Sequence, residues 1–313
     1  MTGVAELDKF ISVARRTWRI FFKELWLLLR LRSFRRGQQR NTDNLTKFVV
    51  LCWRRTGSNW LCGILHNHPD IFMHNEIFNE TSIHTYYPNV LGKWSFSSRD
   101  LNPQLFLDEM LSIKSTVDIN TKKFQAVGFK SFPEHYWDGT NPNSLLEHTF
   151  LTFMEDRSMK KVILHRKNVF AVYISMVRSR KTGGYLTTNY DNLKININIQ
   201  ELQSFIDRYS FCYRQYTELS RWQSAFYIEY EDLLGPGYDN IIKELTKFLG
   251  VTVEVPLPLP ETVPQSSGDI SDAILNYEEI EFAWRHTSLS EFLLPIKIKD
   301  NVVHSEELSL IHI

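Results

Sequence analysis

Two short segments of this sequence combine the residue types that bind phosphate-like anions. The first, residues 53–60 (WRRTGSNW), contains arginine, two hydroxyl residues and a glycine. Arg55 offers a delocalised positive charge with a fork of donors, and Gly57 lets main-chain N–H groups approach an anion closely. The second segment holds Arg166 and, nine residues later, Ser175. An arginine and a serine so placed can grip one phosphate group from two sides, so both segments indicate an anion-binding site.

The first segment is not the phosphate-binding loop of nucleoside triphosphatases. That loop reads G-x-x-x-x-G-K-[ST], and neither its upstream glycine nor its lysine occurs at the required place around Gly57. A nucleoside triphosphatase and a required magnesium ion are therefore disfavoured. A plain turn, with Ser58 as the N-cap of the next helix, stays open as an alternative for this segment.

Each anion-binding segment follows an apolar run that predicts a buried strand. Residues 47–53 (KFVVLCW) lead into the first segment, and a helix over residues 58–67 follows it. Residues 162–165 lead into Arg166, and the helix after it carries Ser175. The start of a helix directly after a strand favours an anion, because the first N–H groups lack partners and the helix dipole is positive there.

The same alternation of strand and helix recurs along the chain. Further strands are predicted at residues 124–129 and 225–229, and further helices at residues 145–155, 200–222 and 239–249. Alternating elements of this kind predict an α/β fold, a mainly parallel sheet flanked by helices on both faces.

The composition is that of an ordinary globular protein. The 313 residues are 43% hydrophobic and 23% charged, which excludes a disordered tail protein, a collagen-like repeat and a multi-pass membrane protein. The three cysteines, Cys52, Cys62 and Cys212, are too few for a disulfide framework. They fit a reducing compartment, so a cytoplasmic location is expected.

The formal net charge is zero, but it is unevenly distributed. Residues 1–40 hold ten basic and three acidic side chains, a net charge of +7, so the rest of the chain sums to −7. Residues 8–36 predict an amphipathic helix whose longest apolar run, five residues, is too short to span a membrane or to serve as a secretion signal. We divide the chain into a basic leader and linker at residues 1–45 and one domain at residues 46–313. The leader helix is expected either to lie on an anionic membrane surface as a peripheral contact or to pack on the body or a partner subunit.

Together the two segments resemble the sulfotransferases that use 3′-phosphoadenosine 5′-phosphosulfate. The first is similar to the family's 5′-phosphosulfate loop, and Arg166 and Ser175 are similar to its 3′-phosphate pair. The closer likeness is to the bacterial branch of carbohydrate, glycolipid and nodulation sulfotransferases, in which a G-E-x-F-N-like segment follows; here it is residues 74–79 (HNEIFN). The resemblance implies a P-loop-like sulfotransferase fold and donor-binding residues at Arg55, Thr56, Gly57, Ser58, Asn59, Trp60, Arg166 and Ser175.

The resemblance also implies an activity: transfer of a sulfuryl group to an acceptor hydroxyl, on a carbohydrate or glycolipid, with no metal required. As in phosphoryl transfer, the acceptor attacks in line and negative charge grows on the leaving oxygen. The protein then needs cations and N–H donors at the leaving group and a base at the acceptor. Arg55 fits the first task, and Glu76 matches the family's catalytic glutamate.

Several of these roles have competitors. Glu76 is alternatively an exposed acid that caps a turn, and His66, His68 and His74 are rival bases because a neutral histidine accepts protons near pH 7. His66 and His68 also suggest a metal pair, but no third ligand has the spacing of a metal site. Lys130 is expected either near the sulfate or as a surface lysine.

Two different functions remain as rivals. A kinase with a degenerate loop would bind a nucleotide with magnesium, and a binding module that has lost catalysis would bind the cofactor product without transfer. No nucleic-acid partner is expected, and a homo-oligomer is left open. Five aromatic residues of the presumed acceptor loops are expected to stack on sugars or to belong to the core: Tyr86, Tyr87, Trp94, Tyr185 and Tyr190.

Overall fold

The computed structural model of the chain describes residues 45–112, 124–136, 144–184, 190, 193–251, 257, 259–260 and 270–293. The predicted leader helix at residues 8–36 falls outside these ranges, so its membrane or packing role stays a prediction. Within them, no helix combines the length and the apolar character needed to cross a membrane.

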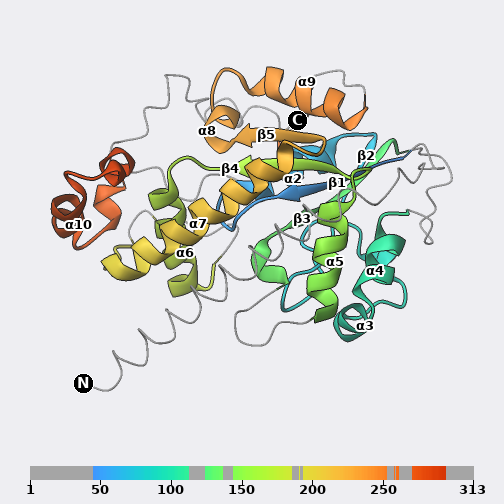
Figure 1. Cartoon of the computed structure of the whole chain (residues 1–313), viewed down its shortest axis with the longest axis horizontal. Coiled ribbons are helices and arrows are strands. Elements are labelled where there is room, and N and C mark those ends of the chain that lie inside the picture. Colours follow the sequence, from blue (N-terminus) through green and yellow to red (C-terminus); the bar gives the residue numbers. More distant parts are fainter. Residues whose placement is uncertain are drawn as a thin grey trace, which may run out of the picture.

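A parallel sheet of five strands lies at the centre of the described chain (Figure 1). The strands are β1 Thr46–Leu51, β2 Ile71–Met73, β3 Ala126–Ser131, β4 Lys160–His165 and β5 Ala225–Glu229. Their order across the sheet is β2-β3-β1-β4-β5, and each neighbouring pair is parallel. The predicted α/β fold with a mainly parallel sheet is confirmed.

Helices flank this sheet on both faces (Figure 1). The α-helices are α2 Ser58–Asn67, α3 Phe96–Leu101, α4 Pro103–Met110, α5 Ser144–Glu155, α6 Val169–Thr182, α7 Ile199–Ser220, α8 Tyr230–Leu233, α9 Tyr238–Leu249 and α10 Tyr277–Trp284. The described residues also form four short 3-10 helices: η1 Pro88–Leu91, η2 Pro133–His135, η3 Ser271–Ala273 and η4 Ser288–Leu293. Buried side chains of α2 and α9 pack on one face, and those of α5, α6 and α7 pack on the other.

Strand β1 shows why the sheet is buried on both sides. Phe48 and Val50 belong to the core under α2 and α9, whereas Val49 and Leu51 belong to the core under α5 and α7. All four side chains are fully buried. Successive side chains of a strand point to opposite faces, so a strand covered on both faces is continuously apolar. Each such side chain contributes about 1.5–3 kcal/mol on burial.

The predicted strands and helices match the observed ones closely, but several short elements were missed. β2 has three residues and α3 has six, too few to show a period of two or of 3.6 residues. α4 begins at Pro103, a position where proline is tolerated because its missing N–H would have no partner. Of these elements, α3 lies within residues 78–102, a stretch that was expected to be an acceptor loop.

The order of the strands reverses between β1 and β4. After β1 the chain forms β2 and β3 on one side of the sheet and then crosses to β4 and β5 on the other. Ligands of open α/β sheets bind beyond the carboxyl ends of the strands at such a switch point. Both predicted anion-binding segments lie there, because residues 52–57 follow β1 and Arg166 follows β4.

Candidate active site

The loop between β1 and α2 adopts a left-handed main-chain conformation at two residues. Gly57, with φ of 83°, is the N-cap of α2, and Arg55 has φ of 67°. This conformation costs a residue with a Cβ about 1–2 kcal/mol, and such strain concentrates at functional sites. A Cβ at position 57 would lie 2.2 Å from the ring of Tyr230, so glycine is required. The alternative of Ser58 as the N-cap is wrong, because Gly57 takes that position.

Of the polar residues after Arg55, Thr56 closes the loop, and Ser58 and Asn59 lie on the first turn of α2. Thr56 is fully buried, and its hydroxyl donates to the Trp53 carbonyl over 2.7 Å, which closes the loop on itself. Ser58 is buried at the start of α2, and the side-chain oxygen of Asn59 accepts a hydrogen bond from Lys130. The N–H groups of Trp60 and Leu61 donate to the Gly57 carbonyl. The N–H groups that precede them in α2 have no acceptor one turn earlier in the helix, so they are the donors this loop can offer to an anion.

The two predicted anion-binding segments meet directly. Nε of Arg55 donates to the hydroxyl of Ser175 over 2.9 Å, and Nη1 of Arg166 donates to the Arg55 carbonyl over 3.2 Å. The three side chains are half-buried. Two guanidinium groups and a helix N-terminus therefore share one end of the sheet. This concentration of positive charge is suited to a ligand that carries several negative charges.

The Arg166 end of the site is supported by α8, which follows β5 directly. The guanidinium carbon of Arg166 lies 4.7 Å from the ring centre of Tyr230, within the range of a cation–π contact. The carboxylate of Glu231 accepts hydrogen bonds from the N–H groups of Lys167 and Asn168, at 3.0 and 3.2 Å. Asn168 in turn caps α6, the helix that carries Ser175. The acidic segment after β5 thus fixes the start of that helix.

Glu76 lies in a cluster of donors just after β2. Its carboxylate oxygens lie 2.8 Å from Nζ of Lys130 and 3.5 Å from Nε2 of His135, and Asn79 donates to it over 2.8 Å. Lys130 is fully buried, so the alternative of a surface lysine is wrong. Lys130 also donates to Asn59 on the first turn of α2. This contact joins the Glu76 cluster to the anion-binding loop.

The carboxyl of Glu76 is strongly ionised in this setting. Burial opposes ionisation, but the charge of Lys130 and the contact with His135 outweigh it and hold the pKa of Glu76 far below its ordinary value. Its side chain is 17% exposed, so it is not an exposed acid at a turn. A carboxylate with so low a pKa is a weak proton acceptor. Its basicity increases when its interaction with Lys130 weakens.

The three histidines that compete for the role of base have other contacts. His74 is fully buried, its ring nitrogens lie 2.9 Å from the Thr85 hydroxyl and 3.1 Å from the Met110 carbonyl, and burial lowers its pKa to about 4. His68 accepts the N–H of Asp70 at the exit of α2, and His66 stacks on Tyr86 with ring centres 4.2 Å apart. None of these contacts joins a histidine to Glu76 or Arg55.

The aromatic residues expected to stack on sugars or to pack in the core have mixed positions. Trp94 and Tyr190 are buried, and Tyr87 stacks on the core residue Phe72 with ring centres 3.9 Å apart, so these three belong to the core. Tyr185 lies outside the described residues. The predicted donor residue Trp60 is half-buried on α2, and its ring centre lies 5.5 Å from that of Tyr238.

Three contributors to this site carried no signal of function in the sequence: His135, Tyr209 and Tyr213. His135 lies just after β3, and the two tyrosines come from α7. Tyrosines at positions 209 and 213 are one helical turn apart and fit a core stripe. Only their contacts in the fold link them to Arg166 and the loop after β1. In the described ranges, no three His, Cys, Asp or Glu side chains gather in an arrangement that would hold a metal ion.

Comparisons with known proteins give matches among solved structures. No protein-family model matches the chain, and no curated protein matches it. A sulfotransferase from Alicyclobacillus acidocaldarius is 14% identical, with a TM-score of 0.43, over 79% of this chain and 94% of that protein. The sulfotransferase domain from the curacin biosynthetic pathway is 14% identical, with a TM-score of 0.39, over 82% and 95% of the two chains.

A third similar structure is the mouse sulfotransferase SULT7A1 complexed with PAP. It is 13% identical, with a TM-score of 0.38, over 67% of this chain. The match spans 60% of the mouse protein, less than two thirds of its length. The fold of the present chain is defined independently of these matches by its strand order and parallel pairing.

Proposed function

We propose that the chain is a sulfotransferase that moves a sulfuryl group from 3′-phosphoadenosine 5′-phosphosulfate to an acceptor hydroxyl. The observation that carries the proposal is the meeting of Arg55, Ser175 and Arg166 at the carboxyl ends of β1 and β4, joined through Asn59 and Lys130 to the carboxylate of Glu76. One site thus offers cations and N–H donors for a leaving phosphate together with a carboxylate for the acceptor proton.

The anion-binding half of the site fits the two ends of this co-substrate. Residues 55–60 supply a guanidinium group and the N–H groups of the first two residues of α2 for the 5′ end. Arg166 and Ser175 supply a guanidinium group and a hydroxyl for the 3′-phosphate. Because Arg55 already contacts Ser175, the two phosphate-binding parts form one continuous surface. The co-substrate supplies the activated sulfuryl group, and the protein orients it and stabilises the charge of the leaving phosphate.

In the catalytic half of the site, the basicity of Glu76 depends on which groups contact the ammonium group of Lys130. In the structure Lys130 lies against Glu76 and Asn59, and it lowers the basicity of Glu76. An anionic group bound beside Asn59 competes for the same ammonium group. Such competition raises the pKa of Glu76 toward its ordinary value. Glu76 then accepts the proton of an acceptor hydroxyl only in the loaded site.

The acceptor is proposed to be a carbohydrate or glycolipid hydroxyl. This part of the proposal rests on the resemblance of residues 74–79 to the bacterial branch. The aromatic side chains of Trp94, Tyr87 and Tyr190 do not support it, because they pack in the core. An acceptor screen with sulfated products identified by mass spectrometry is the direct test.

Calorimetric binding of adenosine 3′,5′-bisphosphate against ATP, each with and without magnesium, tests the activity class. We expect metal-independent binding of the bisphosphate. Magnesium-dependent binding of ATP alone would favour the kinase, and bisphosphate binding without transfer to any acceptor would favour the silent binding module. Glu76→Gln is expected to abolish turnover with nearly unchanged bisphosphate affinity. Unchanged turnover in this variant would exclude Glu76 as the base.

A further inference from the structure

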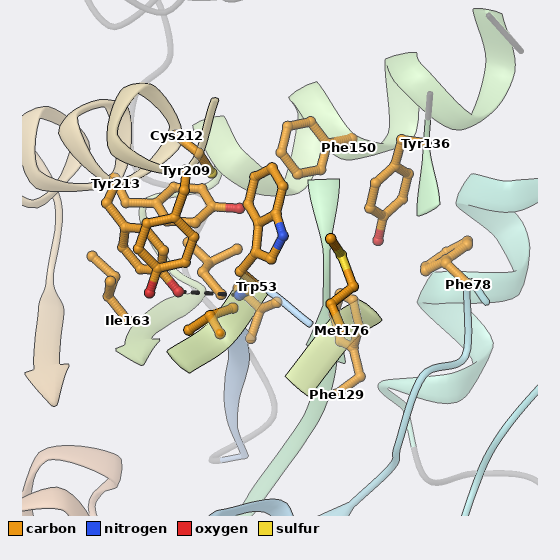
Figure 2. Packing of buried hydrophobic residues seen from close by; sticks show 14 of the residues in the cluster. Trp53, Phe78, Phe129, Tyr136, Phe150, Ile163, Met176, Tyr209, Cys212 and Tyr213 are labelled. Atoms are coloured by element: carbon orange, nitrogen blue, oxygen red, sulfur yellow. Dashed lines mark hydrogen bonds between the residues drawn. The ribbon is translucent and has the colours of Figure 1, made fainter. Parts of the chain in front are cut away.

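Two buried tyrosines of α7 contact the main chain where β1 and β4 separate. The pairing of these strands ends with Leu51 opposite Ile163. Just beyond it, the hydroxyl of Tyr213 accepts the N–H of Trp53 over 3.1 Å and donates to the Leu164 carbonyl over 2.6 Å. Figure 2 shows this side chain reaching from α7 to the Trp53 main chain. One hydroxyl therefore bridges the two strand ends where the β-ladder stops.

Tyr209 makes a similar contact one helical turn away. Its hydroxyl accepts the N–H of Arg166 over 3.1 Å and donates to the carbonyl of the same residue over 2.8 Å. The Tyr209 and Tyr213 rings pack on each other with centres 4.6 Å apart, and Tyr209 also lies edge-on to Trp53 (Figure 2). Both tyrosines are at least 95% buried, so their hydroxyls stay with these main-chain partners.

We propose that Tyr209 and Tyr213 are positioning residues for the anion site, and this inference rests on the proposed function. Tyr209 fixes the main chain of Arg166, whose side chain faces the predicted 3′-phosphate. Tyr213 fixes Trp53, which begins the loop predicted to bind the 5′ end. Switch-point strands must separate to admit a ligand, and their freed N–H and carbonyl groups then need partners. The two phenol hydroxyls fill this need and hold both arginine-bearing segments in place.

Phenylalanine variants remove these hydroxyls and keep the rings. In Tyr209→Phe the N–H and carbonyl of Arg166 lose a buried partner, and the main chain shifts to regain hydrogen bonds. Tyr216→Phe is the matched control: Tyr216 lies on the same helix and is 1% exposed. Its hydroxyl interacts with the side chain of Cys212 and, within the described part of the chain, makes no hydrogen bond to the main chain. A general effect of losing a buried phenol would appear in all three variants.

Calorimetry with adenosine 3′,5′-bisphosphate and with adenosine 5′-monophosphate separates positioning from packing. Tyr209→Phe is expected to weaken bisphosphate binding about tenfold, the effect of one hydrogen-bonded contact, and to change monophosphate binding much less. Tyr213→Phe is expected to weaken both ligands, and Tyr216→Phe neither. An unchanged ratio of the two affinities in Tyr209→Phe, or equal losses in the control, would overturn the inference.

A second measurement is independent of nucleotide binding. Hydrogen exchange of peptides that cover residues 52–58 and 163–168 is expected to be faster in Tyr213→Phe and Tyr209→Phe respectively, and unchanged in Tyr216→Phe. Unchanged exchange in all variants overturns the inference. Wild-type protein that binds neither nucleotide overturns the proposed function, and the exchange data still decide whether the hydroxyls hold the strand ends.

Discussion

Replacing Lys130 with methionine isolates the energetics of the contact between Lys130 and Glu76. Methionine is similar in length to lysine and apolar, so the fully buried position stays filled. The carboxylate of Glu76 then loses the ammonium group at 2.8 Å and keeps Asn79 at 2.8 Å and His135 at 3.5 Å. Two responses are open to the variant: Glu76 stays charged without its partner, or it takes up a proton.

Both responses lead to a similar cost at neutral pH. An unpaired buried charge costs about 3–5 kcal/mol. Glu76 is 17% exposed and keeps its hydrogen bond from Asn79, so we expect a cost at the lower end of this range. Protonating a carboxyl with an ordinary pKa of 4.5 costs about 1.4 kcal/mol per pH unit, or roughly 3 kcal/mol at pH 7. We therefore expect Lys130→Met to lose about 3 kcal/mol of unfolding free energy at pH 7.

The pH dependence distinguishes the two responses. In the wild type the lowered pKa of Glu76 stabilises the fold above its unfolded pKa, and this contribution is lost only as the pH falls below about 4.5. If Glu76 is protonated in the folded variant, its pKa is raised above the unfolded value. The unfolding free energy of the variant then falls as the pH rises from about 4.5 to 7. The deficit against the wild type then shrinks to about 1 kcal/mol at pH 5.

Urea denaturation of a double-mutant cycle provides the assay. Lys130→Met with Glu76→Gln removes both charges and leaves only neutral groups, so we expect it to recover most of the loss, to within about 1 kcal/mol of the wild type. The reasoning is refuted if the double variant loses as much as the two single variants together, or if Lys130→Met costs less than about 1 kcal/mol at pH 7.

Four further predictions address the loop, a buried histidine and the leader. Arg55→Ala is expected to lower turnover at least about 10²–10³-fold, and steady-state rates within threefold of wild type would contradict its role. Gly57→Ala is expected to cost about 2–4 kcal/mol in urea denaturation through left-handed strain and contact with Tyr230, whereas Gly183→Ala, with φ of 67° and nothing within 4 Å, carries the strain alone; equal losses would count against the contact. Burial lowers the pKa of His74 to about 4, so the unfolding free energy is expected to fall by up to about 3 kcal/mol as the pH falls from about 6.5 to 4. His74→Gln should remove this pH dependence from a series of urea denaturations. If the leader helix is a membrane contact, deleting residues 1–40 abolishes co-sedimentation with anionic liposomes. Equal binding by both forms would exclude the membrane role and leave packing on the body or a partner subunit.

Local sequence patterns were enough to predict most of the elements that carry the site. The run at residues 47–53, the glycine at position 57 and the helix after it report interactions between near neighbours, and these depend on side-chain period and main-chain freedom. The predicted helices at 58–67 and 239–249 agree with α2 and α9 within one residue at each end. The anion-binding role of these segments was predicted from the type and spacing of arginine, serine and glycine, and it stays a prediction.

The strand order decides which residues of these segments come into contact. Nothing in the periodicity places β4 beside β1 or β3 on its other side, since a strand's pattern reports that it is buried and not which strand it pairs with. That order brings Ser175 to Arg55 and Lys130 to Glu76, and it lowers the pKa of Glu76. Tyr209 and Tyr213 have the pattern of core residues in the sequence, yet in the fold their hydroxyls hold the separated ends of β1 and β4. A hydrogen bond between distant residues depends on tertiary packing, so only the folded structure reveals it.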